Sequence, residues 1–409
     1  MIILIKKMYA SIAPGLFIVG YVVGTGSVTS MVVAGARYGM SLTWALLLSC
    51  FFTYIMLIAI GRLTLVTGNT IVYNIKQSFG NITAKVIITG LMVTVISSIS
   101  GVMGIMVEVT NEGINWAIGK NINTILLASF YMAFLLSIFW TGKHKVILQF
   151  MTLLVGLMAL NFIISNFLIV QEPKAILMGL IPSIPKLGEP HLIIAGMVGT
   201  TMSSVVLISR SSLIAESNWT IKELKKEKKD ALVAVCVTFL VSAAIMASAA
   251  GTLNVQKIEV ENVIEMVHAL KPLVGNLAIL VLLIGITAAG LSSIFPNIVL
   301  LPWLVSDYNN NNRNLKSKRS RILAFVIGLS GLIIPVFGGK PIAIMIASQA
   351  FSPILMPMLI VFLLIMLNSK KIMGEYIISK WLNLALVCTL SFSIYMLAIA
   401  VEGYLKYFS

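Results

Sequence analysis

Long apolar stretches follow one another along almost the whole chain and leave little room for a water-soluble domain. Of the 409 residues, 59% are hydrophobic and 11% are charged, whereas soluble domains carry about 25% charged residues. A helix of about 20 apolar residues crosses the hydrocarbon core of a membrane. The pattern predicts eleven such spans, at residues 10–37, 41–66, 84–108, 123–141, 146–170, 191–215, 231–253, 274–304, 321–338, 341–367 and 381–403. We therefore expect an all-α integral membrane protein with one transmembrane domain over residues 1–409.

Two short segments rich in Gly, Ser and Thr interrupt the first and the sixth of these stretches. They read Val23-Gly24-Thr25-Gly26-Ser27-Val28 and Val198-Gly199-Thr200-Thr201-Met202-Ser203-Ser204-Val205. A broken membrane helix must have its unpaired backbone buried in protein or facing a cavity. One break in each half of the chain is typical of secondary transporters built from inverted repeats.

These breaks are the predicted substrate site. The expected substrate-binding residues there are Gly24, Thr25, Gly26, Ser27, Thr200, Thr201, Ser203 and Ser204. In the alternative interpretation these hydroxyls only pack helices closely or bond back to helix carbonyls. Neither break holds an acidic residue, a His or a Cys, so no metal-ligating residue is predicted there.

Basic residues concentrate between the predicted spans. The runs Lys222–Lys229 and Arg313–Arg321 contain five basic residues each. Because cytoplasmic loops retain Lys and Arg, we expect a cytoplasmic N-terminus and an external C-terminus in a bacterial-type inner membrane. The net charge of +15 is then mainly a topology signal. Membrane lipid is an expected partner, nucleic acid is not, and the protein is expected to be a monomer.

No pattern in the chain favours an enzyme. The cysteines Cys50, Cys236 and Cys388 lie in predicted spans without CxxC spacing, which is typical of reduced packing residues. The three histidines lie in predicted loops, and no nucleophile or phosphate-binding motif is present. We expect no catalytic residue and no cofactor.

Several short segments are spread over nearly all of the chain. They are Ala13-Pro14-Gly15 through Ala34-Gly35-Ala36-Arg37-Tyr38-Gly39, Trp44 to Ser49, Thr67-Gly68, Gly179 to Pro185, Ala289-Gly290-Leu291-Ser292-Ser293 and Ser348-Gln349. In sequence and in spacing these segments resemble the Nramp divalent-metal transporters. The resemblance implies the LeuT-type fold, in which five helices are repeated in inverted topology and helices 1 and 6 are broken at midmembrane. The two repeats are then expected at about 10–170 and 191–367, followed by an additional helix at about 381–403.

The chain departs from this family at the places where the family binds metal. The Asp-Pro-Gly-Asn motif of helix 1 falls on residues 24–27, and the Met-Pro-His motif of helix 6 falls on residues 203–205. A second helix-6 histidine falls on Arg210, and the helix-3 Asp falls on Ile105. The helix-3 Glu is matched by Glu108, and the polar Gln349 of helix 10 is retained as a substrate-binding residue.

The remaining groups suit an anion better than a transition metal. Divalent ions need several strong ligands, whereas the free N–H groups at the starts of helix halves attract negative charge. Arg210, inside the sixth span, is a candidate substrate-binding cation because charged residues in spans are functional by default. The alternative is that Arg210 reaches the cytoplasmic edge, where it snorkels or pairs with Glu216.

The coupling ion is expected to be a proton. Glu108 and Glu112 lie four residues apart, hence on one face of a helix, and are the candidate proton-coupling pair. They are alternatively a solvated helix end. Ser292 and Ser293 resemble the place where some LeuT-type transporters hold sodium, which is the second coupling candidate.

Together these patterns predict a secondary transporter, a symporter, that moves a small solute by alternating access. A small anion or carboxylate, such as bicarbonate, is the first substrate candidate. The alternatives are a transporter of magnesium or another divalent metal ion, and a substrate sensor that does not transport.

Overall fold

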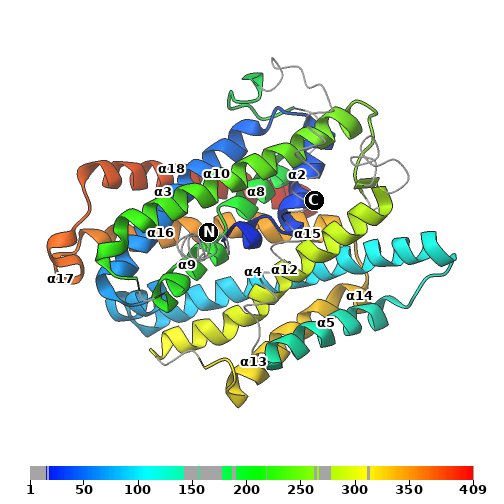
Figure 1. Ribbon diagram of the computed structural model, residues 1–409. Coiled ribbons are helices and arrows are strands. Elements are labelled where there is room, and N and C mark those ends of the chain that lie inside the picture. The colour runs from blue at the N-terminus through cyan, green and yellow to red at the C-terminus, as the bar shows by residue number, and fades with distance from the viewer. Residues whose placement is uncertain are drawn as a thin grey trace, which may run out of the picture.

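The computed structural model is a bundle of helices, and among the residues that it describes there is no strand (Figure 1). The structure describes residues 15, 18–141, 156, 177–186, 190–217, 219–261, 265–266, 278–310 and 314–408. The α-helices are α2 (Thr25–Tyr38), α3 (Thr43–Thr67), α4 (Ile71–Ile118), α5 (Thr124–Thr141), α8 (Pro190–Thr201), α9 (Ser204–Glu216), α10 (Leu224–Ala249), α12 (Ala278–Tyr308), α13 (Lys318–Gly328), α14 (Ile333–Phe337), α15 (Pro341–Ala350), α16 (Ser352–Asn368), α17 (Lys370–Met373) and α18 (Lys380–Phe408). Short 3-10 segments η1 (Ile221–Glu223), η5 (Leu329–Leu332) and η6 (Gly374–Tyr376), and a π-helical segment η2 (Ala250–Asn254), connect or extend them.

Nine helical segments within the described residues are long and apolar enough to span a membrane. They correspond to nine of the eleven predicted spans. The predicted span 146–170 lies outside the described residues, apart from Gly156. The first predicted span is described at residue 15 and from residue 18 onwards. The all-helical membrane fold is therefore confirmed.

Both predicted helix breaks are present. Residues 18–22 are helical, the chain leaves the helix at Val23 and Gly24, and α2 begins at Thr25. In the second half α8 ends at Thr201, Met202 and Ser203 are not helical, and α9 begins at Ser204. The breaks are shorter than predicted, because residues 25–27 form the first turn of α2 and residues 200–201 belong to the last turn of α8.

The broken helix α8–α9 lies at the centre of the bundle. The apolar part of Pro190–Glu216 is buried throughout. Helix α8 packs against α2, α3, α15 and α18, and α9 packs against α3 and α4 (Figure 1). The first and second breaks are thus brought together, because α2 and α8 are direct neighbours.

Helix α4 is longer than the predicted span 84–108. It runs from Ile71 to Ile118 with one kink at Gly80, where φ is +91°. That conformation is accessible to glycine at little cost. The long part of α4 packs along α12, and together they close one side of the central pocket.

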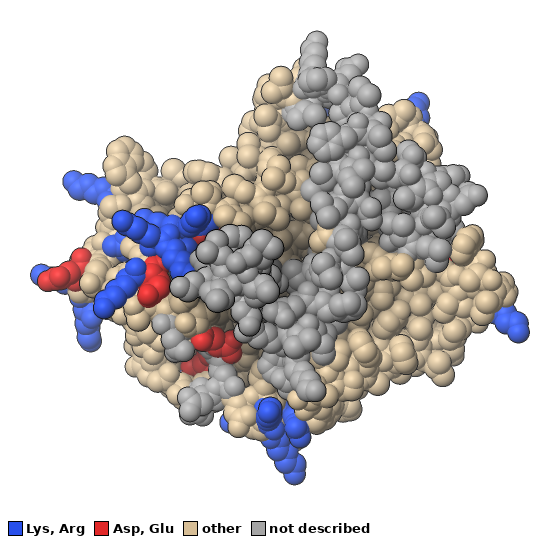
Figure 2. Space-filling model, viewed as in Figure 1, with Lys and Arg blue, Asp and Glu red and all other residues tan. Residues whose placement is uncertain are grey.

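The outer surface is mostly uncharged (Figure 2). Phe51 is 55% exposed, Trp381 79% and Phe337 83%, as expected for side chains that face lipid. In Figure 2 the Lys and Arg side chains gather mainly towards the end of the molecule where α10 begins and α17 lies.

Candidate functional site

A small cavity of about 40 Å³ lies between the two helix breaks. A space of about 10–15 Å³, measured in this way, holds one water molecule, so the cavity has room for roughly three. Its lining consists of Tyr21, Val22, Gly24, Gly26, Ser27, Thr94, Ser98, Val102, Thr200, Ser203, Val205, Val206, Ser293, Asn297, Met345 and Gln349. These described residues supply hydroxyls, two amides, a thioether and apolar groups but no charged side chain.

Six of the predicted substrate-binding residues line this cavity: Gly24, Gly26, Ser27, Thr200, Ser203 and Gln349. The other hydroxyls at the breaks bond elsewhere. The Thr25 hydroxyl donates to the carbonyl of Ile286 at 3.4 Å, and the Thr201 hydroxyl donates to the carbonyl of Met197 at 2.9 Å. The backbone N–H of Ser204 donates to the hydroxyl of Ser352 at 2.8 Å, which caps the start of α9.

The glycines of the first break are required by close packing. A β-carbon at Gly24 would lie 1.8 Å from the hydroxyl oxygen of Ser293. A β-carbon at Gly26 would lie 2.4 Å from the terminal methyl of Met345 and 2.9 Å from the amide nitrogen of Gln349. The first break therefore touches α12 and α15 directly, and only glycine leaves the cavity open there.

The second break makes an equally close contact. A β-carbon at Gly199 would lie 1.9 Å from the backbone carbonyl oxygen of Gln349. Backbone cannot move aside as a flexible side chain can, so Gly199 fixes the distance between α8 and α15. This contact places the amide of Gln349 at the cavity.

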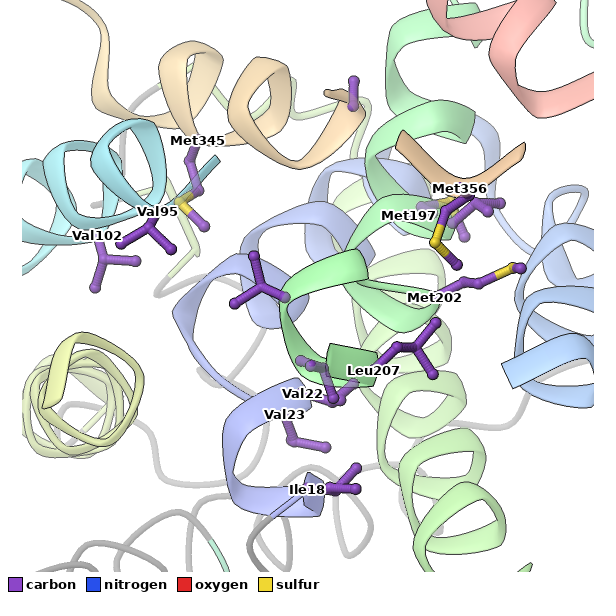
Figure 3. Packing of buried hydrophobic residues seen from close by; sticks show 14 of the residues in the cluster. Ile18, Val22, Val23, Val95, Val102, Met197, Met202, Leu207, Met345 and Met356 are labelled. Carbon is purple, nitrogen blue, oxygen red and sulfur yellow. The ribbon is translucent and has the colours of Figure 1, made fainter. Parts of the chain in front are cut away.

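Sequence reasoning missed five polar or polarisable residues of the lining, which are Tyr21, Thr94, Ser98, Asn297 and Met345. Tyr21 donates its hydroxyl hydrogen to the side-chain oxygen of Asn297 at 2.5 Å, and the Asn297 amide donates to the carbonyl of Ser293 at 3.0 Å. Met345 lies one turn before Gln349 on α15 and points towards Val95 and Val102 of α4 (Figure 3). Tyr21 stands three residues before Gly24, but nothing in the sequence pairs it with a residue 276 positions away.

Apolar side chains close the cavity on the side of the first helix half. Val22 from the segment before the first break and Val205 and Val206 from α9 line the same cavity. Val22, Val23 and Leu207, which Figure 3 labels, are at most 3% exposed.

The structure does not place Arg210 at the cavity, where it was expected to bind the substrate. Arg210 is fully buried, and its guanidinium contacts Asp230 at 2.5 Å and the Glu227 carboxylate at 3.2 Å. It is absent from the cavity lining. The alternative pairing with Glu216 is replaced by these two acids at the start of α10, which sequence reasoning had assigned to a charged connector.

The predicted coupling residues Glu108 and Glu112 lie outside the cavity. Glu108 is six residues beyond Val102 on α4, about 9 Å further along the helix, and is partly exposed, as is Glu112. Ser293 lines the cavity, whereas Ser292 does not; each hydroxyl donates to the carbonyl of Ala289 at 2.9 Å. The roles of these two acids and two serines remain predictions.

The described residues contain no group of three or more His, Cys, Asp or Glu side chains that could hold a metal ion. A metal bound in the cavity would have to be held by neutral ligands. The described lining offers the amides of Asn297 and Gln349, the thioether of Met345, and the hydroxyls of Tyr21, Ser27, Thr94, Ser98, Thr200, Ser203 and Ser293.

Comparisons with known proteins agree with this architecture. The crystal structure of a mutant of the Eremococcus coleocola manganese transporter superimposes with a TM-score of 0.74 over 97% of this chain and 86% of that chain, at 14% identity. MHP1, a nucleobase-cation-symport-1 family transporter, superimposes with a TM-score of 0.59 over 96% of this chain and 92% of that chain, at 11% identity. At these identities the likeness shows the fold alone, which is LeuT-type.

Two of the sequence relatives are named as divalent metal cation transporters. The divalent metal cation transporter MntH of Clostridium acetobutylicum is 29% identical over 208 residues, which cover 49% of this chain and 47% of that protein. MntH of Pectobacterium carotovorum is 21% identical over 97% of this chain and 96% of that protein. The Natural resistance-associated macrophage protein 2 homolog of Dictyostelium discoideum is 25% identical over 91% of this chain and 60% of that protein.

A family model described as Nramp, natural resistance-associated macrophage protein-like, matches residues 15–401. This range includes both helix breaks, the cavity lining and the buried ion pairs. Because the match extends over nearly the whole chain, the protein belongs to the Nramp family.

Proposed function

We propose that the protein is a secondary transporter of a divalent metal cation, which it moves by alternating access. The observation that carries the proposal is a central cavity between two broken helices, lined by neutral oxygen ligands, in a chain of the Nramp family. Relatives named as divalent metal cation transporters support the choice of substrate.

The chemistry of the cavity favours a hard cation that keeps part of its water shell. Mg²⁺ loses water reluctantly and usually retains several water molecules in protein sites. Room for roughly three waters, beside the hydroxyls of Ser27 and Ser203 and the amide of Gln349, suits such an ion. Carbonyls at the end of α8 add the partial negative charge of a helix C-terminus. Magnesium is thus the first candidate, and manganese, which lacks carboxylate and imidazole ligands here, is the second.

The structure removes the main argument for an anionic substrate, which was a positive charge on Arg210 at the site. Arg210 was the cation expected to balance a bound carboxylate or bicarbonate. Its charge is already balanced by Glu227 and Asp230. The N–H groups at the starts of α2 and α9 remain as a feature that favours an anion. They support an anion less strongly than the family relationship supports a cation.

Reconstitution into liposomes tests the proposal. We expect saturable Mg²⁺ uptake into vesicles that hold the purified protein and a magnesium indicator, with slower uptake of Mn²⁺. Uptake of bicarbonate or a small carboxylate, with neither metal entering, would overturn the proposal. Binding of Mg²⁺ without uptake would support the sensor instead.

A matched pair of glycine variants checks that uptake uses this cavity. In Gly26→Ala the new methyl must displace the end of Met345 and the Gln349 amide. Overpacking of this kind costs about 1–3 kcal/mol of stability, and because the methyl also takes up space in the cavity, the apparent affinity for Mg²⁺ should fall by up to about 150-fold. Gly156→Ala is the control, because Gly156 is exposed and is not part of the cavity lining.

A further inference from the structure

Three charged side chains meet in the interior just beyond the cavity. Arg210 lies four residues after the cavity residue Val206 on α9, and it contacts Glu227 and Asp230 of α10. Glu227 and Asp230 are three residues apart and therefore share one face of the helix. All three side chains are at most 1% exposed. We call this group the buried triad.

The buried triad joins the elements that close one side of the cavity. One carboxylate oxygen of Asp230 accepts a hydrogen bond from the backbone N–H of Gly15 at 2.9 Å, ahead of the first break. The other oxygen binds Arg210 of α9. The Glu227 carboxylate packs against Gly61 of α3. A β-carbon at Gly61 would lie 2.2 Å from a carboxylate oxygen of Glu227. The chain before the first break, α3, α9 and α10 therefore meet at this group.

The charges of the triad do not balance. One guanidinium and two ionised carboxylates leave one negative charge, and an uncompensated charge in the interior is strongly unfavourable. The other titratable groups that act on the two acids, among the described residues, are Tyr54 of α3 and Lys226 and Lys228 of α10. Lys228 is exposed and Lys226 lies over the ring of Trp219, so neither of these lysines forms an ion pair with the triad.

The hydrogen bonds show which acid can carry the extra proton. Both oxygens of Asp230 are engaged by strong donors, Arg210 and Gly15. Glu227 binds Arg210 through one oxygen at 3.2 Å, and its second oxygen is buried without a hydrogen-bond partner among the described residues. A bare carboxylate oxygen in this position is more costly than the neutral hydroxyl of a protonated acid.

We propose that Glu227 is a proton-binding site that couples proton movement to transport. In the packed conformation a proton is bound to the second carboxylate oxygen of Glu227, which makes the triad neutral. When the chain before the first break moves away from Asp230, water reaches the triad, the O–H bond of Glu227 breaks and the proton passes to water. Proton release therefore accompanies opening on this side of the cavity. The coupling to uptake rests on the proposed transport function, whereas proton binding itself does not.

Infrared difference spectroscopy tests the bound proton without any substrate. The wild type in its closed state should show the carbonyl stretch of a protonated carboxylic acid at neutral pH. The band should be lost in Glu227→Gln and should shift when glutamate, but not aspartate, carries a ¹³C-labelled carboxyl group. A band that persists in Glu227→Gln, or that shifts with labelled aspartate, would overturn the proposal, as would the absence of a band in the wild type.

Glu223→Gln is the matched control for this substitution. Glu223 precedes α10, is partly exposed and forms a capping box with Thr220. A glutamine at this position of a capping box serves the same purpose, so the helix start should be preserved. Glu223→Gln should keep the infrared band of the wild type. In liposomes, its uptake should still respond to a pH gradient.

Transport in liposomes tests the coupling. With Mg²⁺ outside and a pH indicator inside, wild-type uptake should acidify the lumen and increase when an inward proton gradient is imposed. In Glu227→Gln both effects should disappear. If Glu108→Gln removes them and Glu227→Gln does not, the coupling belongs to Glu108 and the proposal is overturned. If wild-type vesicles take up neither Mg²⁺ nor Mn²⁺, the proposed substrate fails, and the infrared band still decides whether Glu227 holds a proton.

Discussion

Replacement of Arg210 by glutamine should destabilise the whole protein rather than weaken the binding of a substrate. The substitution removes the single cation of the buried triad and leaves two carboxyl groups in an environment where they are at most 1% exposed. Breaking a buried ion pair from one side costs about 3–5 kcal/mol, because the remaining charge is uncompensated. Here two acids lose the same partner, so we expect a loss of at least about 3 kcal/mol in the free energy of unfolding.

The sign of the pH dependence follows from the charges. In Arg210→Gln, the folded state is disfavoured by carboxylates that are ionised without a cation. Lower pH supplies protons that neutralise them, so the difference from wild type should shrink as pH falls and grow as pH rises. The triple variant Arg210→Gln, Glu227→Gln and Asp230→Asn removes every charge of the triad and should regain most of the lost stability, since neutral replacements of buried ion pairs are often tolerated.

The measurement is unfolding by sodium dodecyl sulfate in mixed micelles, followed by circular dichroism at several pH values. Wild type, Arg210→Gln, the double variant Glu227→Gln with Asp230→Asn, and the triple variant form a cycle whose non-additivity gives the interaction energy between Arg210 and the two acids. An Arg210→Gln protein as stable as wild type, but unable to bind substrate, would refute this reasoning and return Arg210 to the role of a free cation.

Two further substitutions test the packing of the cavity. Gly199→Ala should lower the free energy of unfolding by about 1–3 kcal/mol or more, because its methyl would meet the backbone carbonyl of Gln349; wild-type stability in the same detergent titration would show that α8 and α15 are not packed as described. Tyr21→Phe removes the hydrogen bond to Asn297, which contributes about 0.5–1.5 kcal/mol to stability. If this bond holds Asn297 in place for the ion, calorimetry should show Mg²⁺ binding weakened by up to about tenfold, and an unchanged affinity would mean that this pair does not shape the site.

The helix breaks could be predicted from sequence because their signal is local. Glycine and hydroxyl residues stand out within an apolar stretch, and a break in hydrocarbon has few tolerated solutions. Gly24, Gly26, Ser27, Thr200 and Ser203 were found in this way and do line the cavity. The packing that requires glycine at positions 24 and 26 could not be predicted. The contacts are a hydroxyl of α12 and a methyl of α15, which belong to residues more than 200 positions away in the sequence.

The partners of Arg210 were missed for a different reason. Glu227 and Asp230 lie in a run dominated by lysines, and such a run is typical of a solvated connector. The structure extends α10 upstream of the predicted span to Leu224, so that these two acids face inwards while the neighbouring lysines 225, 228 and 229 face out. The spacing of three between the acids was the available signal. This spacing predicts that the two acids share one face of a helix. It does not predict that Arg210 of α9 faces them.

A cavity without a formal charge has an electrical consequence for the transport cycle. If the site carries a divalent cation, that ion moves with its two full charges across the membrane field, because no side chain in the described lining offsets them. Each charge is worth about 2.3 kcal/mol per 100 mV, so the metal ion contributes about 4.6 kcal/mol per 100 mV to the loaded step. A coupled proton on Glu227 would add its own charge to this contribution. The cavity lining itself contributes no charge to the return step, so the voltage dependence of that step would report on the buried triad alone.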